Sequence, residues 1–338
     1  MVEGVSTPEK RSERVVLEAY MAYWDPTRMP RLKRIIFDNS LGQKEAVELV
    51  KTGEGRVDLV TELSPLETLR VAESPFAAVV KTRGAPISVF GQFNMRKAAS
   101  PWHDVRLRQA VNYAINREDL IRYATKGNGV ILPALVPVQG FGYDPTLTPY
   151  PFDPTTARQL LREAGYPDGR TLVLIAPEDL TVQATVVGKM LEQVGLTVDL
   201  QLLDQVAYNQ QVDISAPAQP AAPPTWDIAL ASWMDGMNFP VFQVYHHFAL
   251  DGPFDWVSEQ PELRRLYAEA LRTTDREQQQ EVIRQMERHT RDQAYFLFLY
   301  NPIKLYAVNK AVAFVPYITG YLTFAETQVT EQHWSIRK

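Results

Sequence analysis

Residues 226–247 read WDIALASWMDGMNFPVFQVYHH and combine one strand with one loop. Two sets of side chains alternate along the first half: Ile228, Leu230 and Ser232 fall on one side, and Ala229, Ala231 and Trp233 on the other. Small residues on both faces favour a central strand that is covered on both sides. The Asp235-Gly236 pair then predicts a turn, and an aromatic segment starts at Phe239-Pro240. Open α/β sheets bind ligands where a strand ends in such a loop, at the carboxyl edge of the sheet.

The composition is that of a globular protein with more than one core. A chain of 338 residues, 45% hydrophobic and 22% charged, is long enough for two lobes. The 40 acidic and 35 basic residues give a net charge of −5, and no basic run or aromatic-basic interleaving suits a phosphate backbone. We therefore expect no nucleic-acid partner. Because cysteine is absent, disulfides, zinc-thiolate sites, iron–sulfur clusters and a cysteine nucleophile are excluded.

The sequence leaves the localisation unknown. No window approaches the roughly 20 apolar residues that a membrane helix needs, and residues 1–16 lack the apolar core of a signal peptide. The residues given therefore indicate neither export nor a membrane anchor. The lack of cysteine does not decide the compartment, because both cytosolic and many exported bacterial proteins manage without it.

Periodicity and caps predict an alternation of strands and helices, which indicates an α/β fold with a parallel sheet between helices. Strands are expected from Arg14 and at 32–37, 56–60, 77–81, 87–93, 172–175, 196–202, 295–300 and, as an edge strand, 304–309. Helices are expected at 44–51, 65–72, 104–123 with a second cap at Asn116, 153–165, 181–194, 261–272 and 275–291. Residues 130–152 are expected to form a long surface loop, and the proline-rich stretch 213–225 a mobile excursion.

Several stretches carry a resemblance that runs along nearly the whole chain in the same order. They are AYWDPTRMPRLKRIIF (22–37), AVELVKTGEGRVDLV (46–60), HDVRLRQAVNYAINREDLIRYATKGNG (103–129), FDPTTARQLLREAGYPDG (152–169) and MLEQVGLTVDL (190–200) with WDIALASW (226–233). Together they resemble the family 5 extracellular solute-binding proteins, which include the oligopeptide-, dipeptide- and nickel-binding components of bacterial ABC transporters.

The resemblance implies a type II, periplasmic-binding-protein-like (Venus flytrap) α/β fold with two lobes and a hinge. Residues 1–92 with 299–338 would form lobe I and residues 93–298 lobe II, with crossings near Gly91–Asn94 and Leu299–Asn301. Compared with the family, lobe I is expected to lack its first strands and the extra domain. An exposed apolar edge there would recruit a second copy or a completing chain.

The binding site implied by the resemblance lies around the loop after the central strand. The candidate ligand-binding residues are Trp233, Met234, Asp235, Gly236, Tyr245, His246, Phe93, Asn94, Tyr300 and Asn301. Peptide-binding members carry an aspartate three residues after the tryptophan, where it meets the ligand's α-ammonium. Here that position is Gly236 and the acid is Asp235, so a free peptide N-terminus is not assured as the ligand.

Each candidate also has a structural interpretation. Asp235 is either a carboxylate that binds a cation or the residue that forms an Asp-Gly turn. Trp233 and Tyr245 are expected to stack on a ligand rather than only to fill the wall of the cleft. His246-His247 are adjacent, so their side chains diverge, and we expect neither a metal site nor a cofactor. Asp104, Arg106 and Arg108 are expected to act as a helix cap and a structural ion pair rather than as a site.

The first functional hypothesis is capture of a small or medium organic ligand, peptide-like or other, between two lobes for ABC-type uptake, with a permease as partner. No Gly-x-Ser-x-Gly, no phosphate-cradling Gly-x-x-x-x-Gly-Lys and no Gly-x-Gly-x-x-Gly after a strand is present. An enzyme is therefore the second hypothesis: a cytosolic, biosynthetic one that uses the same cleft. A truncated, ligand-silent fragment is the third.

Overall fold

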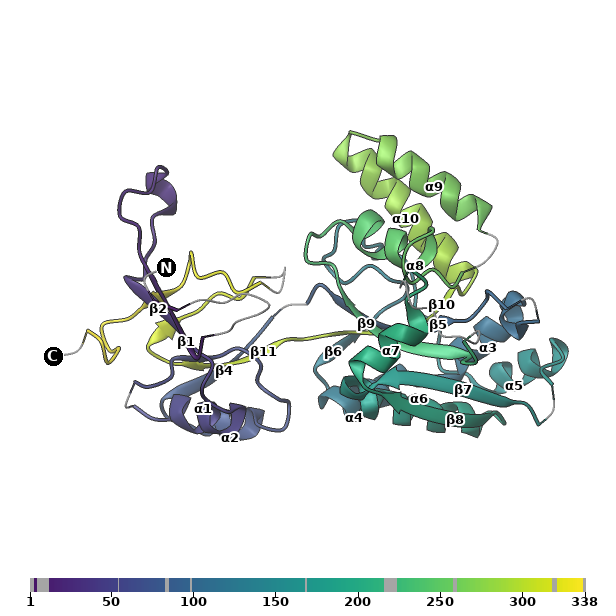
Figure 1. Cartoon of the computed structure of the whole chain (residues 1–338), viewed down its shortest axis with the longest axis horizontal. Coiled ribbons are helices and arrows are strands. Elements are labelled where there is room, and N and C mark those ends of the chain that lie inside the picture. The colour runs from purple at the N-terminus through teal and green to yellow at the C-terminus, as the bar shows by residue number, and fades with distance from the viewer. Residues whose placement is uncertain are drawn as a thin grey trace. The chain divides into compact units, whose positions relative to one another are not determined.

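The computed structural model describes residues 3–4, 12–53, 55–82, 85–97, 99–167, 169–215, 224–257, 260–317 and 321–336. The chain divides into two units (Figure 1). The first comprises Met1–Arg83 and Ile303–Lys338, and the second Gly84–Pro302. Most of the predicted excursion at 213–225 lies outside the described residues.

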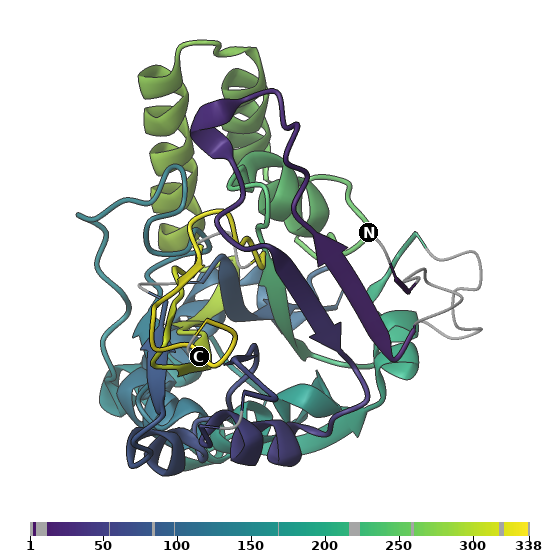
Figure 2. The ribbon, with the colours of Figure 1, turned by 90° about the vertical axis from the view of Figure 1, so that its left-hand side faces the viewer.

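The described residues of the first unit form three small sheets and two α-helices, and the core of the unit lies between the helices and the three-stranded sheet. The strands β1 (Arg14–Glu18) and β2 (Arg34–Asp38) form an antiparallel pair, and Figure 2 shows them side by side with their connecting loop extending beyond the strand ends. The second sheet has the order β3 (Leu59–Val60), β11 (Leu305–Asn309), β4 (Ala77–Lys81). The remaining elements are the helices α1 (Gln43–Val50) and α2 (Thr68–Ala72) and the short pair β12 (Val312–Ala313) and β13 (Gln328–Val329).

The position of β11 corrects one prediction. All five of its residues are buried, and it pairs with β3 on one side and β4 on the other, so it is a central strand and not an edge strand. Its Leu305 and Ala307 pack against Val47 and Val50 of α1. A strand that is paired on both sides and covered by a helix favours apolar residues, which residues 305–308 (LYAV) supply before the polar Asn309.

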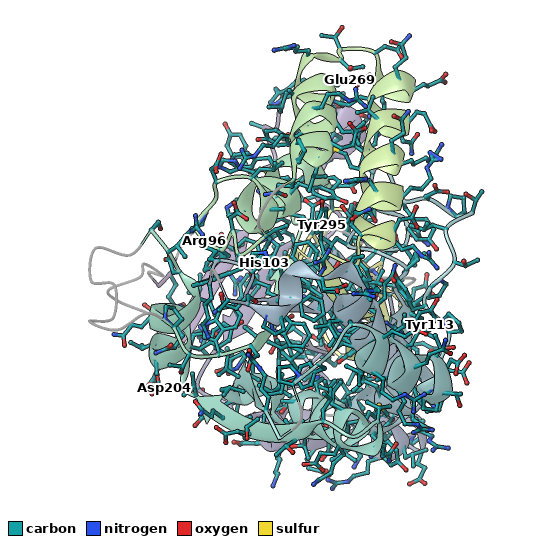
Figure 3. The ribbon with its side chains drawn as sticks, turned by 90° about the vertical axis from the view of Figure 1, so that its right-hand side faces the viewer. Arg96, His103, Tyr113, Asp204, Glu269 and Tyr295 are labelled. Carbon is teal, nitrogen blue, oxygen red and sulfur yellow. The ribbon has the colours of Figure 1, made fainter. Side chains whose placement is uncertain are left out.

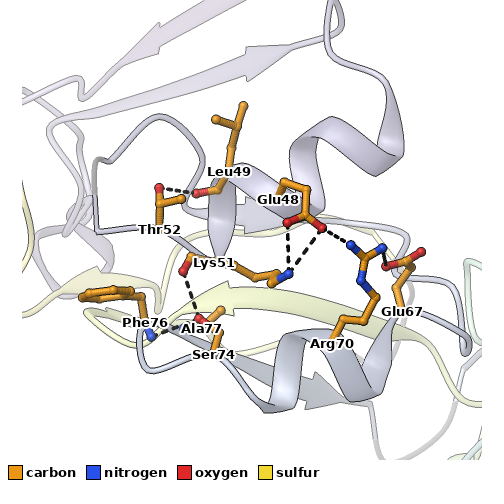
Figure 4. A network of polar contacts seen from close by, with 9 residues as sticks. All are labelled: Glu48, Leu49, Lys51, Thr52, Glu67, Arg70, Ser74, Phe76 and Ala77. Carbon is orange, nitrogen blue, oxygen red and sulfur yellow. Dashed lines mark hydrogen bonds and ion pairs between the residues drawn. The ribbon is translucent and has the colours of Figure 1, made fainter.

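Hydrogen bonds join α1, α2 and the start of β4 (Figure 4). The Ser74 hydroxyl donates to the Lys51 carbonyl at 3.0 Å and accepts from the Phe76 and Ala77 N–H groups at 3.1 and 3.2 Å. At the surface, the Glu48 carboxylate pairs with both Lys51 and Arg70. Exposed ion pairs contribute little to stability, so the buried Ser74 hydroxyl is the more important of these links.

The second unit is built on a six-stranded mixed sheet in the order β6 (Gly129–Ile131), β10 (Phe296–Pro302), β5 (Ile87–Phe93), β9 (Ile228–Met234), β7 (Thr171–Pro177), β8 (Thr197–Leu203). The strands β9, β7 and β8 are mutually parallel, as the strand–helix–strand alternation predicted, whereas β6, β10, β5 and β9 pair antiparallel. The helices are α3 (Val105–Ala114), α4 (Arg117–Thr125), α5 (Pro154–Glu163), α6 (Thr181–Gln193), α7 (Gln205–Val212), α8 (His247–Ala249), α9 (Pro261–Arg272) and α10 (Arg276–Asp292).

Side chains from both faces of β9 are buried, as predicted for a covered central strand. Ile228 and Leu230 enter the main core, which also holds Leu191 of α6. Ala229 points the other way, into a smaller cluster with Tyr208 of α7. The sequence did not predict α7, which buries only Tyr208 and Val212 and so has little apolar periodicity.

The predicted boundaries of the lobes fall inside the second unit. The positions 92/93 and 298/299 lie within β5 and β10, which are hydrogen-bonded neighbours in one sheet, and the division lies instead at Arg83/Gly84 and Pro302/Ile303. The strands that hold the two expected crossings do pair, with Leu297 opposite Gly91 and Tyr300 opposite Val89. The hinge expected near Gly91–Asn94 and Leu299–Asn301 stays a prediction.

The segment 130–152 is only partly the surface loop that was expected. Its residues 132–137 are buried, and side chains supply hydrogen-bond partners for their backbone groups. The Ser88 hydroxyl, for example, donates to the Leu135 carbonyl at 2.7 Å. Gly142, at φ +90°, lies so close to Ile283 of α10 that an added Cβ would come within 2.2 Å of that side chain. Only glycine permits both this backbone conformation and this approach.

Candidate functional site

Three strand ends meet at one edge of the six-stranded sheet. The strand β9 ends here, opposite the start of β5, because Met234 pairs with Ile87. The end of β10 lies on the other side of β5, where Tyr300 pairs with Val89. We call this region, formed by residues 85–88, 233–238 and 300–302, the carboxyl edge. It includes the loop from which the sequence predicted a binding site.

Asp235 is the first candidate residue at the carboxyl edge. It has features of a turn-forming residue and of a carboxylate that could bind a ligand. Its N–H donates to the Pro86 carbonyl at 2.6 Å, and its Oδ1 accepts from the Phe239 N–H at 3.0 Å, which is the turn-forming role. Its Oδ2 is buried and has no hydrogen-bond partner among the described residues. Burial raises the pKa of the Asp235 carboxyl, and backbone N–H groups of the turn oppose that rise.

Asn301 holds the same short segment from the side of β10. Its Nδ2 donates to the carbonyls of Ala85 and Ile87, and the side chain is fully buried. Its Oδ1, like Oδ2 of Asp235, finds no partner within the described ranges. The two candidates therefore flank residues 85–87, and each retains an unused hydrogen-bond acceptor.

Trp233 and Met234 differ in exposure. The Trp233 ring packs in an aromatic cluster with His247, Phe248 and Phe254 at centroid distances of 5.1, 4.9 and 5.6 Å, and its Nε1 is buried without a partner in the described part of the chain. Met234 is exposed. The turn at Gly236 also exposes Met237, which the sequence analysis did not select. The flexible thioether side chains give this edge an adaptable apolar surface.

Tyr245 lies in the core and not at the carboxyl edge. Its side chain is fully buried, and its hydroxyl donates to Oε1 of Glu287 on α10, while Oε2 of Glu287 accepts from the Val136 N–H at 2.9 Å. Burial raises the pKa of the Tyr245 hydroxyl and raises the pKa of Glu287 to about 7. The expected stacking of Tyr245 on a ligand does not fit this placement, because the π-helix Val241–His246 turns the residue inward.

Phe93 and Asn94 lie at the opposite edge of the sheet. The Asn94 N–H donates to the Asp227 carbonyl at 3.0 Å, just before β9 begins, and the Phe93 ring packs on Trp102. This placement follows because β5 runs antiparallel to β9, so the end of β5 meets the start of β9. A ligand-binding role for Phe93 and Asn94 stays a prediction. Tyr300 lies at the carboxyl edge, where it pairs with Val89 and its hydroxyl accepts from Gln183 Nε2 of α6 at 2.9 Å.

His246 faces helix α9. Its ring is stacked between Phe242 and Tyr267, at centroid distances of 5.4 and 6.4 Å. The neighbouring His247 directs Nδ1 at the Phe242 carbonyl, 2.8 Å away, so the two rings diverge. Within the part of the chain that the structure describes, no three His, Cys, Asp or Glu side chains group into a metal site.

The charged residues of the 104–108 segment have structural roles, as expected. Asp104 caps α3 by accepting from the Arg106 N–H at 2.8 Å and pairs with the Arg106 guanidinium. Arg108 is buried over the Tyr295 ring and donates to backbone carbonyls, including that of His103 (His103 and Tyr295 are labelled in Figure 3). Arg117 has a similar structural role that was not predicted: its guanidinium donates to the carbonyls of Phe298, Asn112, Ile115 and Tyr150.

The comparisons with known proteins agree with this architecture. The family model "Bacterial extracellular solute-binding proteins, family 5 Middle" matches residues 7–253. The glutathione-binding protein GsiB of Pectobacterium atrosepticum is 28% identical over 193 residues, which cover 56% of this chain and 36% of that protein. None of the helices in the described ranges is long and apolar enough to cross a membrane.

Two solved structures illustrate the likeness in fold. The ABC transporter substrate-binding protein CtaP of Listeria monocytogenes superposes with a TM-score of 0.79 at 19% identity, covering 95% of this chain and 65% of CtaP. The periplasmic binding protein DppA of Helicobacter pylori, in complex with the peptide STSA, gives 0.73 at 20% identity, covering 95% and 61%. The chain thus spans about a third of its curated relative and under two thirds of these structures. The fold is the expected α/β periplasmic-binding-protein fold, and the chain belongs to the family 5 bacterial extracellular solute-binding proteins.

Proposed function

We propose that this chain captures a small or medium organic ligand, peptide-like in its hydrogen-bonding groups, for ABC-type uptake, and that the carboxyl edge contributes ligand contacts. Membership of family 5 supports the proposal, as do a relative named as a glutathione-binding protein and a structural neighbour solved with a peptide. The observation that carries it is the pair of buried oxygens, Oδ2 of Asp235 and Oδ1 of Asn301, without partners among the described residues.

The energetics of these two oxygens favour a ligand that donates hydrogen bonds. A buried acceptor left without a donor costs about 1–3 kcal/mol, which a ligand N–H or O–H group would offset. Asp235 adds a carboxylate, so an ammonium or amide group is the best match in chemistry. Met234 and Met237 are exposed at the same edge and offer apolar contact to the body of such a ligand.

Two partners belong to the same proposal. An ABC permease would receive the ligand.

The first unit would associate with a second copy or a completing chain, because Leu66 and Leu69, beside and on α2, expose more than two thirds of their surface. Sedimentation velocity over a range of concentrations tests this association: a single monomeric species throughout counts against it.

The ligand-binding proposal is tested in two steps. Native mass spectrometry of the purified protein identifies a retained ligand, and calorimetry with that ligand, or with di- and tripeptides and glutathione if none is retained, measures affinity. Asp235→Asn keeps the oxygen that caps Phe239 and replaces Oδ2 by an amide. We expect binding to weaken about tenfold or more, since 1.4 kcal/mol corresponds to a factor of ten.

Asp204→Asn is the matched control. Asp204 likewise accepts backbone hydrogen bonds, from the Val206 and Ala207 N–H groups at 2.9 Å, but it is exposed and follows β8, which β7 separates from β9 in the sheet. The affinity of Asp204→Asn for the ligand should equal that of the wild type. Equal affinity in Asp235→Asn as well, with the fold intact by circular dichroism, would place the ligand contacts elsewhere.

A further inference from the structure

The loop between β1 and β2 presents three large apolar side chains to solvent. Tyr20, Met21 and Trp24 are 68%, 73% and 80% exposed, and we call them the aromatic tip. The strands stop at the Glu18–Arg34 pair, and the Ala19 N–H bonds the Lys33 carbonyl at 3.0 Å, so residues 20–32 extend beyond the sheet. Figures 1 and 2 both show this loop extending past the ends of the strands.

The aromatic tip has a defined local structure. Asp25 accepts from the Thr27 N–H at 2.9 Å and from its hydroxyl at 2.7 Å, and so caps the one-turn helix Pro26–Arg28. The Tyr23 N–H bonds the Tyr20 carbonyl at 3.2 Å, and the Tyr23 and Trp24 rings lie 5.7 Å apart. The loop therefore holds its large apolar side chains in a defined arrangement that is exposed to water. Exposure of apolar surface to water is unfavourable in free energy.

Basic side chains follow the tip in the same loop. Residues 20–33 contain Arg28, Arg31 and Lys33, all exposed, and one acid, Asp25, a net charge of 3 − 1 = +2 in a chain of net −5. Arg28, Arg31 and Glu326 all lie near the Tyr317 hydroxyl, so Glu326 offsets one of these charges and a positive excess remains. Tyrosine and tryptophan beside arginine and lysine are the residue types of the water–lipid interface.

We propose that the aromatic tip inserts into an anionic lipid surface, with Arg28, Arg31 and Lys33 against the headgroups. Charge favours this occupant over a second copy of the tip, because two positive loops repel each other. The order of residues favours it over nucleic acid, because the aromatic side chains precede the basic ones instead of alternating with them. The proposal concerns the first unit alone and is independent of the ligand-binding proposal.

Co-sedimentation of the purified chain with vesicles tests it. Vesicles of phosphatidylglycerol and phosphatidylcholine in equal parts should retain the protein at low salt. Pure phosphatidylcholine vesicles should retain at least fivefold less. Tyr20→Ser/Trp24→Ser should weaken partitioning about tenfold or more, and Arg28→Gln/Arg31→Gln/Lys33→Gln about fivefold or more, with the second loss vanishing at 0.5 M salt.

Val206→Ser/Leu271→Ser is the matched control, because these side chains are 68% and 53% exposed and belong to the second unit, outside the aromatic tip. It should leave partitioning unchanged. Wild-type protein that stays in the supernatant, or tip variants that partition like wild type, would overturn the proposal. Tip variants that instead dissolve a dimer, seen by sedimentation velocity without lipid, would assign the surface to a second copy.

Discussion

Two aspartates stand at the two ends of β9, Asp227 before it and Asp235 after it, and each is only 3% exposed. Asp227 directs one carboxylate oxygen at the Arg170 guanidinium, while the other accepts from the Val173 N–H at 3.0 Å. Asp235 uses one oxygen to cap a turn, and the other has no partner in the described structure. The two carboxylates are therefore equally buried, but both oxygens of Asp227 have partners and only one oxygen of Asp235 does. The unused acceptor of Asp235 is what suggests a ligand.

Asp227→Asn should have the largest effect on stability. Both oxygens accept from donors, so the new amide N–H would face either the guanidinium or the Val173 N–H, and Arg170 would lose its counter-charge. Breaking a buried pair costs about 3–5 kcal/mol, and we expect about 3 kcal/mol because the Arg170 side chain is 30% exposed. Urea unfolding at pH 7 measures it. A loss below 1 kcal/mol would mean that the two aspartates are equivalent.

Glu287 extends the comparison to a third buried carboxylate, whose oxygens are both bonded but to neutral donors. Burial raises its pKa from 4.5 to about 7, so the folded protein holds the proton more tightly than the unfolded chain. Its stabilising contribution is complete below pH 4.5 and is lost as the pH rises through 7, by up to about 3 kcal/mol. Urea unfolding between pH 4 and 8 should show this decline.

Glu287→Gln is the matched variant for that experiment. Its carbonyl oxygen accepts from the Val136 N–H and its amide donates to the Tyr245 oxygen, as the protonated acid would. The decline with pH attributed to this position should therefore disappear. An identical pH profile in wild type and variant would show that folding does not change the pKa of Glu287, and it would contradict this prediction.

Local chemistry made much of the fold predictable from sequence. Asp104, Asn116 and Asp153 each accept a backbone hydrogen bond within two or three residues, so a helix start can be recognised from a short stretch. The strand Ile87–Phe93 was likewise predicted with its true bounds, since it is rich in the β-branched and aromatic residues that favour strands. Such signals need no knowledge of distant partners.

Long-range pairing explains what the sequence analysis missed at the candidate site. Phe93 was selected beside the expected crossing near Gly91–Asn94, and it lies at the edge opposite the carboxyl edge because β5 runs antiparallel to β9, which nothing within 87–93 indicates. Tyr245 was misplaced because Glu287, 42 residues away, draws its hydroxyl into the core. Asp235 lies just after β9 and Asn301 near the end of β10, and both strand ends lie at one edge of the sheet, so the two residues stay candidate ligand-binding residues.

The smallest expected effect on stability belongs to Asp235→Asn, the same substitution as at Asp227. The cap on Phe239 survives, and the change removes a buried carboxylate whose pKa is raised, so the ligand-free protein should be as stable as wild type or more stable by about 1 kcal/mol. Urea midpoints at pH 7 measure this.

With the ligand found by mass spectrometry, the order of stability of wild type and Asp235→Asn should reverse, because saturating ligand stabilises the tighter-binding wild type more. A ligand-free loss above 2 kcal/mol would make Asp235 a structural residue like Asp227. If Asp235→Asn is more stable than wild type without ligand and less stable with it, the unpaired oxygen of Asp235 serves binding at a cost in stability.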